Sequence, residues 1–376
     1  MTTDEAGDGP APACVVVGGS LVGMSAATVL SRLGFAVTVL ERSPARGWTG
    51  GGGLGVDVAL LREVTGIDDA PPVVHGSDRD TTAWHLLQGW LEDHALALGV
   101  TVRRGTEVTA VRPGAGRAAA GAASADGDEY SADLVIVADG ARSENRASVV
   151  PHDPGARYAG VLLWRALVDE QALPDEVARL RSGEPSREVY AGPYRLVTYL
   201  VPGAEGQAAV GRRRLNLVWY DPEQGDLLRG LGLLAGETVH ASLAPQDVPG
   251  PIRERLAAFA AANWPSPWRE ALALALASGT VFGTPIVHCK PGQLVRGRAA
   301  LAGDAAHAAS PMVGGGFREG LHDVAALAEV MADLTSPTAI PDALARYQRL
   351  RLVPGTRHVT ISEQATADYL ARAARG

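Results

Sequence analysis

The sequence predicts an α/β protein with three parts: a Rossmann-like domain, an antiparallel-sheet domain inserted into it, and helices at the C-terminus. The stretch VVVGGSLVGMSAATVLSRLGFAVTVLERS, residues 15–43, is typical of a strand, a glycine turn, a helix and a second parallel strand. Between Tyr158 and Tyr220, strand-like runs alternate with turns, which favours an antiparallel sheet. The residues from Ile340 onward follow a helical pattern.

The first unit is expected to start with a strand at Ala13 to Val17. A helix should follow from about Leu21 to Leu33, and Gly34 should end it. Ala36 to Leu40, AVTVL, then reads as the next buried strand. Together these elements predict one parallel βαβ unit.

Further along the chain, the pattern predicts five more features. They are a glycine-rich loop at 47–56, a helix at about 82–98, an exposed hairpin tip in the low-complexity segment 115–129, a strand within 133–140 and a helical stretch at 252–277.

These features lead to a predicted division of the chain. Residues 1–12 are expected to form a disordered tail. The nucleotide-binding domain is predicted to comprise 13–75, 95–157 and 278–335, the substrate domain 76–94 and 158–277, and the C-terminal helices 336–376.

Composition excludes several classes of protein. A net charge of −8 argues against nucleic acid as the main partner, and no apolar run is long enough to cross a membrane. The N-terminus, MTTDEAGDGPAPA, has no apolar core of the kind found in signal peptides, so a cytoplasmic protein is expected. Cys14 and Cys289 are too few for a disulfide framework and read as small core residues, and the histidines show no metal-ligand spacing.

The glycine turn after the first strand departs from the pattern Gly-x-Gly-x-x-Gly. Gly18 allows the tight turn and Gly23 allows the helix to pack closely on the sheet, but Ser20 replaces the middle glycine. A serine is small and its hydroxyl can donate to a phosphate oxygen. The helix that begins at Leu21 presents free N–H groups to a pyrophosphate. The turn therefore predicts a dinucleotide site.

An acidic residue ends the second strand of this unit. Glu41 follows Gly18 by 23 residues and is placed to accept hydrogen bonds from ribose hydroxyls, and Arg42 beside it can cover the adenine. A carboxylate here favours an unphosphorylated ribose. The ligand is therefore expected to be FAD or NAD rather than NADP.

A second motif, LAGDAAHAASPMVGGGF at 301–317, favours a flavin. Asp304 follows a strand and can bind a polyol such as ribityl. The glycines let backbone N–H groups face the edge of a flat ring, and the positive end of the next helix suits an anionic reduced flavin. The residues concerned are Gly314, Gly315, Gly316 and Phe317. A third motif, ADGARS, places Asp139 after another strand.

With these motifs in this order, the sequence resembles the class A flavin-dependent aromatic hydroxylases, which have the p-hydroxybenzoate hydroxylase fold. It is most similar to the 2,6-dihydroxypyridine 3-hydroxylase branch. The stretches that carry this likeness are GGSLVG, TTAWHLL, YAGVLLWRALVDE, YLVPG and RRRLNLVWY. The resemblance implies a GR2-type Rossmann-like FAD-binding domain. It also implies that serine in place of the middle glycine, as at Ser20, is usual in this branch.

The resemblance also implies roles for single residues. The FAD contacts it implies are Gly18, Ser20, Leu21, Glu41, Arg42, Asp139, Asp304, Gly314, Gly315, Gly316 and Phe317. Two departures stand out, since the family often has Asn where Arg318 stands and often has an FAD-binding arginine where Trp84 stands.

The chemistry implied by the family is monooxygenation. NADH or NADPH reduces FAD, and O2 forms a flavin C4a-hydroperoxide that hydroxylates a small heteroaromatic or phenolic substrate. A dimer through the second domain is also implied. His307 and Tyr199 are the candidate catalytic residues, because a base that ionises a substrate hydroxyl would activate the ring. Trp164, Trp219 and Pro311 are the candidate substrate contacts.

Three other functions remain open at this point. One is a natural-product tailoring oxygenase that epoxidises or rearranges a larger compound, which pocket volume would distinguish. Another is a flavin-binding protein without catalysis, against which the intact Asp304, Pro311 and glycine loop argue. A nicotinamide-only dehydrogenase would leave the segment at 301–317 without a purpose.

Overall fold

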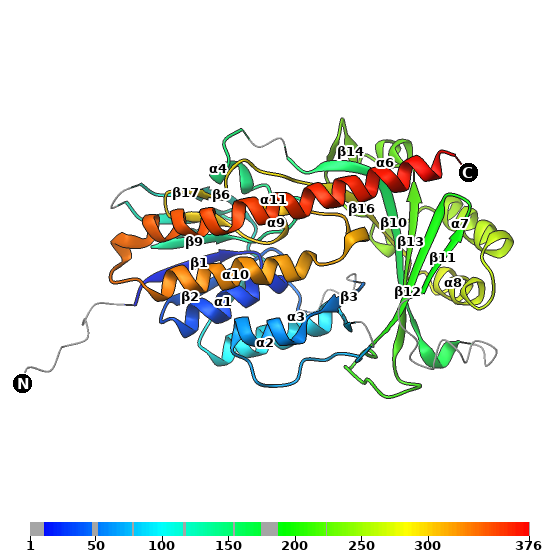
Figure 1. Ribbon diagram of the computed structural model, residues 1–376, viewed down its shortest axis with the longest axis horizontal. Helices are drawn as coiled ribbons and strands as arrows, with labels where there is room; N and C mark the ends of the chain where they lie inside the picture. Colours follow the sequence, from blue (N-terminus) through cyan, green and yellow to red (C-terminus); the bar gives the residue numbers. More distant parts are fainter. Residues whose placement is uncertain are drawn as a thin grey trace, which may run out of the picture.

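The structure is a computed structural model that describes residues 11–46, 52–76, 79–115, 118–152, 155–173, 187–222 and 224–375. The predicted disordered tail, apart from its last two residues, lies outside these ranges. Two large sheets lie at the two ends of the molecule, and a long C-terminal helix runs beside both (Figure 1).

The first sheet contains six strands in the order β17-β18-β9-β1-β2-β5. Their bounds are β1 Ala13–Val17, β2 Ala36–Glu41, β5 Thr101–Arg104, β9 Leu134–Val137, β17 Val295–Arg296 and β18 Ala299–Leu301. Neighbouring strands are parallel except β17 and β18. β1 and β9 are apolar throughout because both faces of the sheet are covered, as is typical of parallel sheets. The predicted βαβ unit is confirmed.

Helices and a small sheet cover these strands (Figure 1). The helices are α1 Leu21–Arg32, α2 Val58–Thr65, α3 Trp84–Ala97 and α10 Gly316–Ala332. The small sheet consists of β6 Val108–Arg112, β7 Ala120–Ser124 and β8 Glu129–Ala132, and it lies against β1 and β9. The expected hairpin tip at 115–129 is therefore wrong in its extent. Ala120 and Ala122 of β7 are buried, and the turn between β7 and β8 is much shorter.

The second sheet contains seven antiparallel strands. Their bounds are β10 Arg157–Asp169, β11 Arg187–Ala191, β12 Tyr194–Val201, β13 Arg214–Pro222, β14 Leu234–Ala235, β15 Thr238–Val239 and β16 Phe282–His288. Helices α7 (Gly250–Asn263) and α8 (Trp268–Ala277) pack on one face of this sheet. The single helical stretch expected at 252–277 is two helices, because Pro265 and Pro267 interrupt it.

The predicted glycine loop at 47–56 is partly a strand. Residues 47–51 lie outside the described ranges, but β3 (Gly53–Val56) pairs with β4 (Asp80–Ala83). β4 lies beside β12, whereas α3, which follows it directly, packs on α1. The segment at 80–97 therefore contacts both sheets. The domain boundaries given above remain a prediction.

Helix α11, Ile340–Ala373, is the longest element (Figure 1). It packs on α10 and also contacts α9 (Asp304–His307), β10 and β16, so it joins the two ends of the molecule. The other elements within the described residues are α4 Arg146–Val149, α6 Gly225–Gly230 and the 3-10 turns Glu170–Ala172, Pro245–Asp247, Pro311–Val313 and Pro337–Ala339.

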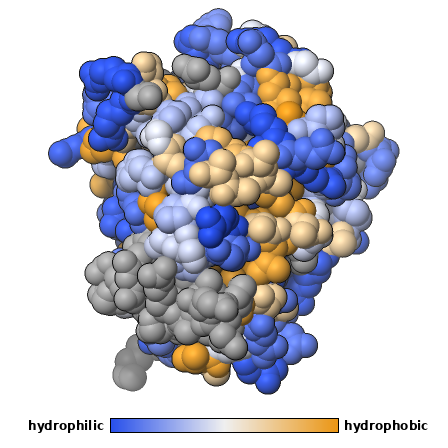
Figure 2. All heavy atoms as spheres, turned by 90° about the vertical axis from the view of Figure 1, so that its right-hand side faces the viewer, coloured by the Kyte–Doolittle hydropathy of each residue, from blue (hydrophilic) through white to orange (hydrophobic). Residues whose placement is uncertain are grey.

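Several general expectations can be compared with the structure. Cys14 and Cys289 are both buried, as predicted for small core residues. In the described part of the chain, no helix is long and apolar enough to cross a bilayer, and no three potential metal ligands are grouped together. Figure 2 shows the end of the molecule formed by the second sheet. Hydrophobic side chains lie from the centre to the upper right of that face, among hydrophilic ones.

Candidate functional site

The glycine turn between β1 and α1 accepts no larger residue at two positions. Gly18 has a φ of +102°, and a Cβ there would lie 2.5 Å from the Ala138 carbonyl oxygen. A Cβ on Gly23 would overlap the carbonyl oxygen of Gly18. Ser20 is the N-cap residue of α1, but its side chain makes no capping hydrogen bond. The hydroxyl of Ser20 and the first N–H groups of α1 therefore remain available for an anion.

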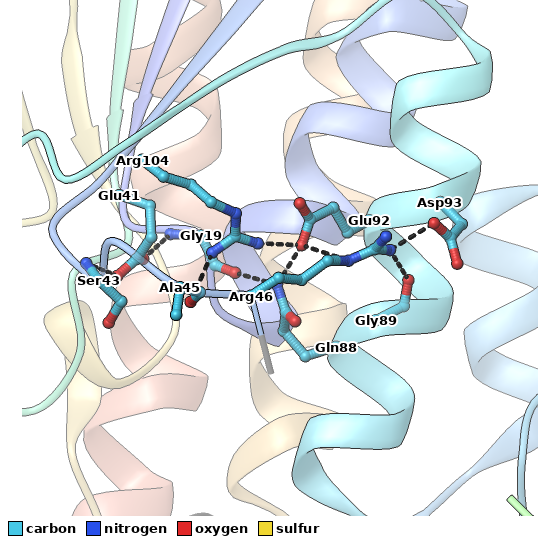
Figure 3. A network of polar contacts seen from close by, with 10 residues as sticks. All are labelled: Gly19, Glu41, Ser43, Ala45, Arg46, Gln88, Gly89, Glu92, Asp93 and Arg104. Atoms are coloured by element: carbon cyan, nitrogen blue, oxygen red, sulfur yellow. Dashed lines mark hydrogen bonds and ion pairs between the residues drawn. The ribbon is translucent and has the colours of Figure 1, made fainter. Parts of the chain in front are cut away.

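The Glu41 carboxylate lies directly beside this turn (Figure 3). One of its oxygens accepts a hydrogen bond of 2.7 Å from the N–H of Gly19, and the other accepts one of 2.8 Å from the N–H of Ser43. Each oxygen keeps a free lone pair for a ribose hydroxyl. Leu21 faces the core, so it can offer a ligand its backbone N–H but not its side chain. Arg42 is exposed and lies within electrostatic range of Arg142.

A buried polar network supports the turn from α3 (Figure 3). Gln88 Nε2 donates to the Gly19 carbonyl at 3.0 Å and to Glu92 Oε2 at 2.9 Å. Glu92 is 3% exposed, and it pairs with Arg104 and with Arg46 Nε. The Gln88 Oε1 atom is buried and has no hydrogen-bond partner among the described residues. This network was not predicted from the sequence. Its only signal there is the polar pair Gln88 and Glu92, four residues apart on an otherwise largely apolar helix.

The loop that contains Asp304 meets the start of α10. Gly314 and Gly315 have φ values of +65° and +85°, which favour glycine. α10 begins at Gly316 without a side-chain cap, so its first N–H groups are available. The Asp304 side chain is exposed, and its Oδ1 atom lies 3.8 Å from the position of a Cβ on Gly316. The two parts of the predicted flavin motif thus come together.

The loop that contains Asp139 is tied to the Asp304 loop by Arg146. This arginine is 1% exposed, and it donates to the carbonyls of Ala305 at 2.7 Å and Ala141 at 2.9 Å. Asp139 accepts a hydrogen bond from Asn145 through one oxygen, while its buried Oδ1 atom has no partner in the part of the chain that the structure describes. Arg146 was not among the predicted site residues.

These loops fit a dinucleotide cofactor such as FAD. They supply two crowded glycines, a helix start without a cap, an anchored carboxylate and buried oxygen atoms that lack a donor. A ligand with a pyrophosphate and ribose hydroxyls would satisfy each of these groups.

His307, the predicted catalytic base, is held in a buried ion pair. Its Nε2 atom lies 2.6 Å from Asp323 Oδ2, and the two side chains are 3% and 0% exposed. Asp323 also accepts from Arg351 at 2.7 Å and from the Gly303 N–H at 2.8 Å. Burial lowers the pKa of His307, but the charge of Asp323 outweighs this effect and raises it. We therefore revise the role of His307 from catalytic base to a buried partner that supports the Asp304 loop.

The predicted substrate contacts Trp164 and Trp219 lie on the face of the second sheet that α7 and α8 cover. Both belong to the core beneath α7 and α8, where Trp164 donates to Asp221 at 2.8 Å and Trp219 packs against Trp264. Side chains alternate along a strand, so the neighbouring residues point to the opposite face. That face turns toward β3, and we revise the assignment of both tryptophans accordingly.

Tyr199 lies on the face turned toward β3. Its Cε2 atom would be 2.7 Å from a Cβ on Gly53, so the strand backbone passes close to the phenol ring. Burial raises the pKa of Tyr199, although Arg165 donates a hydrogen bond to it. Pro311 is exposed in the loop that leads to Gly314. Tyr199 and Pro311 therefore remain candidates for contact with a substrate.

The residues that departed from the family pattern can also be placed. The Glu319 carboxylate pairs with Arg351 at 3.0 Å, while Arg318 lies beside Gly315. The backbone N–H of Trp84 donates to the Gly52 carbonyl at 3.1 Å. Phe317 is partly buried and packs against the hydrophobic core around the first sheet.

Sequence models of three families match parts of the chain. An FAD binding domain-like family matches residues 158–275, an FAD binding domain family matches 290–362, and the pyridine nucleotide-disulphide oxidoreductase family matches 13–46.

Curated relatives align with most of the chain. An aurachin C monooxygenase/isomerase of Stigmatella aurantiaca is 27% identical, covering 90% of this chain and 84% of the relative. A 2,6-dihydroxypyridine 3-monooxygenase of Paenarthrobacter nicotinovorans is 26% identical, covering 84% and 81%. The solved structure of 2,6-dihydroxypyridine-3-hydroxylase from Arthrobacter nicotinovorans has the same fold, with a TM-score of 0.79, 21% identity and coverage of 95% and 92%.

Proposed function

This chain belongs to the class A FAD-dependent aromatic hydroxylases, and on that premise we propose that it hydroxylates a small heteroaromatic or phenolic compound, using O2 and NADH or NADPH. One observation carries the proposal. The loops with Gly18, Asp139 and Asp304 follow β1, β9 and β18, which are neighbouring parallel strands. The carboxyl ends of such strands lie at one edge of the sheet, where α/β proteins bind their ligands.

Each loop has a proposed task in holding FAD. The turn with Gly18 and Ser20 would hold the pyrophosphate, and Glu41 would hold the adenosine ribose with Gln88 beside it. Asp304 would bind the ribityl chain, and the N–H groups from Gly315 to Phe317 would face the isoalloxazine ring. When bound, FAD supplies the redox chemistry, since it takes electrons from the nicotinamide and activates O2.

The second sheet is proposed to close the substrate side of this site. Its face toward β3 carries Tyr199, and the protein must exclude water there and orient the aromatic ring. Burial raises the pKa of Tyr199, so its phenol keeps its proton near neutral pH and can donate a hydrogen bond to a ring oxygen. The dimer through the second domain remains a prediction.

A second candidate function is the tailoring of a natural product. It is favoured by the alignment of nearly the whole chain with a relative described as an aurachin C monooxygenase/isomerase. In this reading the same FAD site would act on a larger ring system, through epoxidation or oxidative rearrangement. The substrate panel in the following test separates the two candidates.

The test is a product assay under labelled oxygen gas. The yellow protein is mixed with NADH or NADPH and with a panel of hydroxypyridines, phenols and quinolones. We expect one labelled oxygen atom in the product of a hydroxypyridine or a phenol. Label only in a quinolone product would favour the second candidate. A panel without labelled product, when reductant is consumed and peroxide forms, would contradict hydroxylation of these substrate classes.

Replacing Asp304 by alanine is expected to weaken FAD binding by roughly 10- to 100-fold, the usual effect of removing a charged hydrogen-bonding group. The flavin-to-protein ratio after purification and an FAD titration of the stripped protein measure this effect. Asp342→Ala, an exposed carboxylate in the first turn of α11, is the control and should retain FAD. Equal flavin content in the two variants would show that the Asp304 side chain does not contribute to FAD binding.

A further inference from the structure

Helix α11 carries three residues on the face that is turned toward the loops of the proposed FAD site. Arg351, Gly355 and His358 follow one another at intervals of four and three residues, so they share one side of the helix. Arg351 binds Asp323, as described above. A Cβ on Gly355 would lie 2.8 Å from His307 Cδ2, so glycine is needed for the close approach of the helix. The third residue, His358, has no role in the site described so far.

The imidazole of His358 reaches the glycine loop of the flavin motif. Its Cε1 atom lies 3.7 Å from the position of a Cβ on Gly315, and Arg318 NH2 lies 3.4 Å from the same position. His358 is half-buried, and its Nε2 atom is buried without a hydrogen-bond partner among the described residues. The proposed site puts the flavin ring against the N–H groups that begin at Gly315. The imidazole is therefore within electrostatic range of the charge that this ring carries.

Charged groups face His358 from two neighbouring helices. They are Arg318 and Glu319 of α10, and Asp304 and His307 of α9. Burial lowers the pKa of His358, and the two cations lower it further, which outweighs the opposite effect of the two carboxylates. The imidazole is therefore neutral near pH 7 until a further negative charge is brought to the site.

We propose that His358 takes up a proton when the bound flavin is reduced and releases it when the flavin is oxidised again. The inference rests on the proposed function and adds a residue that holds a proton during the redox step. A hydride from the nicotinamide carries two electrons and one proton, so a nicotinamide C–H bond breaks and a flavin N–H bond forms. The oxidised nicotinamide leaves with a positive charge and the flavin keeps a negative one. A proton from solvent then binds to the imidazole and balances that charge.

Proton uptake by His358 should make the midpoint potential of FAD depend more steeply on pH. For a two-electron couple, a tenfold change in an equilibrium constant corresponds to about 30 mV, so each proton taken up adds about 30 mV per pH unit. The potential of the wild type should therefore rise by about 30 mV more than that of His358→Gln for each unit by which the pH falls. This holds in the range where His358 is neutral beside the oxidised flavin and charged beside the reduced one.

The test is a redox titration of the FAD-loaded protein against a reference dye, without an aromatic substrate and without turnover. It extends from about pH 5 to about pH 9, on both sides of the ordinary histidine pKa of 6.5. A purely structural role of His358 would leave the slope of potential against pH unchanged. His94→Gln is the matched control, because His94 lies in the last turn of α3 and pairs with Asp69 at 3.1 Å. It should keep the slope of the wild type.

Arg318→Gln provides a second measurement, which decides the question if His358→Gln does not retain FAD. Arg318 lowers the pKa of His358, so its removal should move the steep range of the titration to higher pH. An Arg318→Gln protein with the steep range at the pH of the wild type would contradict the inference.

The outcomes separate this inference from the proposed function. Equal slopes for the wild type and His358→Gln at every pH would show that His358 holds no proton in the redox step. Loss of the steep range in His94→Gln as well would overturn the assignment to His358. In both cases, labelled product would leave the hydroxylase function standing. A steep range that depends on His358, in a protein that forms no labelled product, would support the inference and contradict the hydroxylase function.

Discussion

Asp323→Ala is expected to lower the free energy of unfolding by about 3–5 kcal/mol, the usual effect of removing one partner from a buried ion pair. Asp323 is fully buried and serves three donors: His307, Arg351 and the N–H of Gly303. Without it, two buried cations would face each other and a buried N–H would lose its acceptor. The Asp304 loop begins at Gly303, so FAD affinity should fall as well.

Urea denaturation of the purified variant, with far-UV circular dichroism as the readout, measures this loss. Asp333→Ala is the matched control, because Asp333 also pairs with an arginine, Arg346, but is 67% exposed. Exposed pairs contribute roughly 0–1 kcal/mol, so the control should stay close to the wild type. Equal denaturation midpoints for the two variants would show that the network around Asp323 does not support the fold.

The contribution of this network should also depend on pH. Asp323 has a lowered pKa in the folded protein, because His307 and Arg351 outweigh the effect of burial. The contribution of Asp323 to the free energy of unfolding is therefore present above the ordinary aspartate pKa of 3.8. It is lost as the pH falls through the lower pKa of the folded protein. His307 has a raised pKa, so its share is present below 6.5 and is lost as the pH rises through the folded value.

The stability difference between the wild type and Asp323→Asn should therefore be largest between these two ordinary values. It should decline on the alkaline side as His307 loses its proton. A series of urea titrations across pH 4 to 9 checks this shape. A difference that does not decline toward pH 9 would contradict a contribution from charged His307 in the folded protein.

Gly23→Ala is the second change with a large expected effect. The added methyl group would overlap the carbonyl oxygen of Gly18, and Gly18 has little room to shift because the backbone of Ala138 and Asp139 occupies the space where its own Cβ would lie. Helix α1 would have to shift from β1. We expect a loss of stability of at least about 3 kcal/mol, the upper end for overpacking, and a protein purified without FAD.

The same substitution elsewhere provides a strict control. Gly89 lies within α3, and a Cβ there meets nothing within 4 Å. Gly89→Ala should raise stability by roughly 0.5–1 kcal/mol, because alanine has the higher helix propensity. Thermal unfolding and the flavin-to-protein ratio of both variants measure the contrast. A Gly23→Ala protein that retains FAD and the wild-type melting temperature would contradict the assigned role of the turn.

Local patterns were sufficient for much of the fold. The parallel unit from Ala13 to Glu41 was predictable because its apolar strands, glycine turn and helix are contiguous in sequence. The segment at 301–317 was interpretable for the same reason. β3 and β7 were missed because both are rich in glycine or alanine. Such strands form only where a close neighbouring backbone or a covering sheet selects them.

The candidate site was harder to predict because its residues depend on long-range packing. Alternation along β10 shows that Trp164 and Arg165 face opposite sides, but it does not show which side meets the flavin loops. His307 was a candidate base because it lies within the flavin motif at 301–317. Its partner Asp323 lies 16 residues later in the sequence, and Arg351 lies further still. Nothing in the local sequence pairs these three residues.

The connectivity of the two sheets has a consequence for the order in which the chain can fold during synthesis. Every strand of the second sheet lies within 157–288, so that sheet can close as soon as this stretch leaves the ribosome. The first sheet needs β18 at 299–301 beside β9, and Asp323 then needs Arg351 from α11. A nascent chain thus exposes an unfinished first sheet until residues 299–301 have emerged, and the segment around Asp304 gains its support from Arg351 only later.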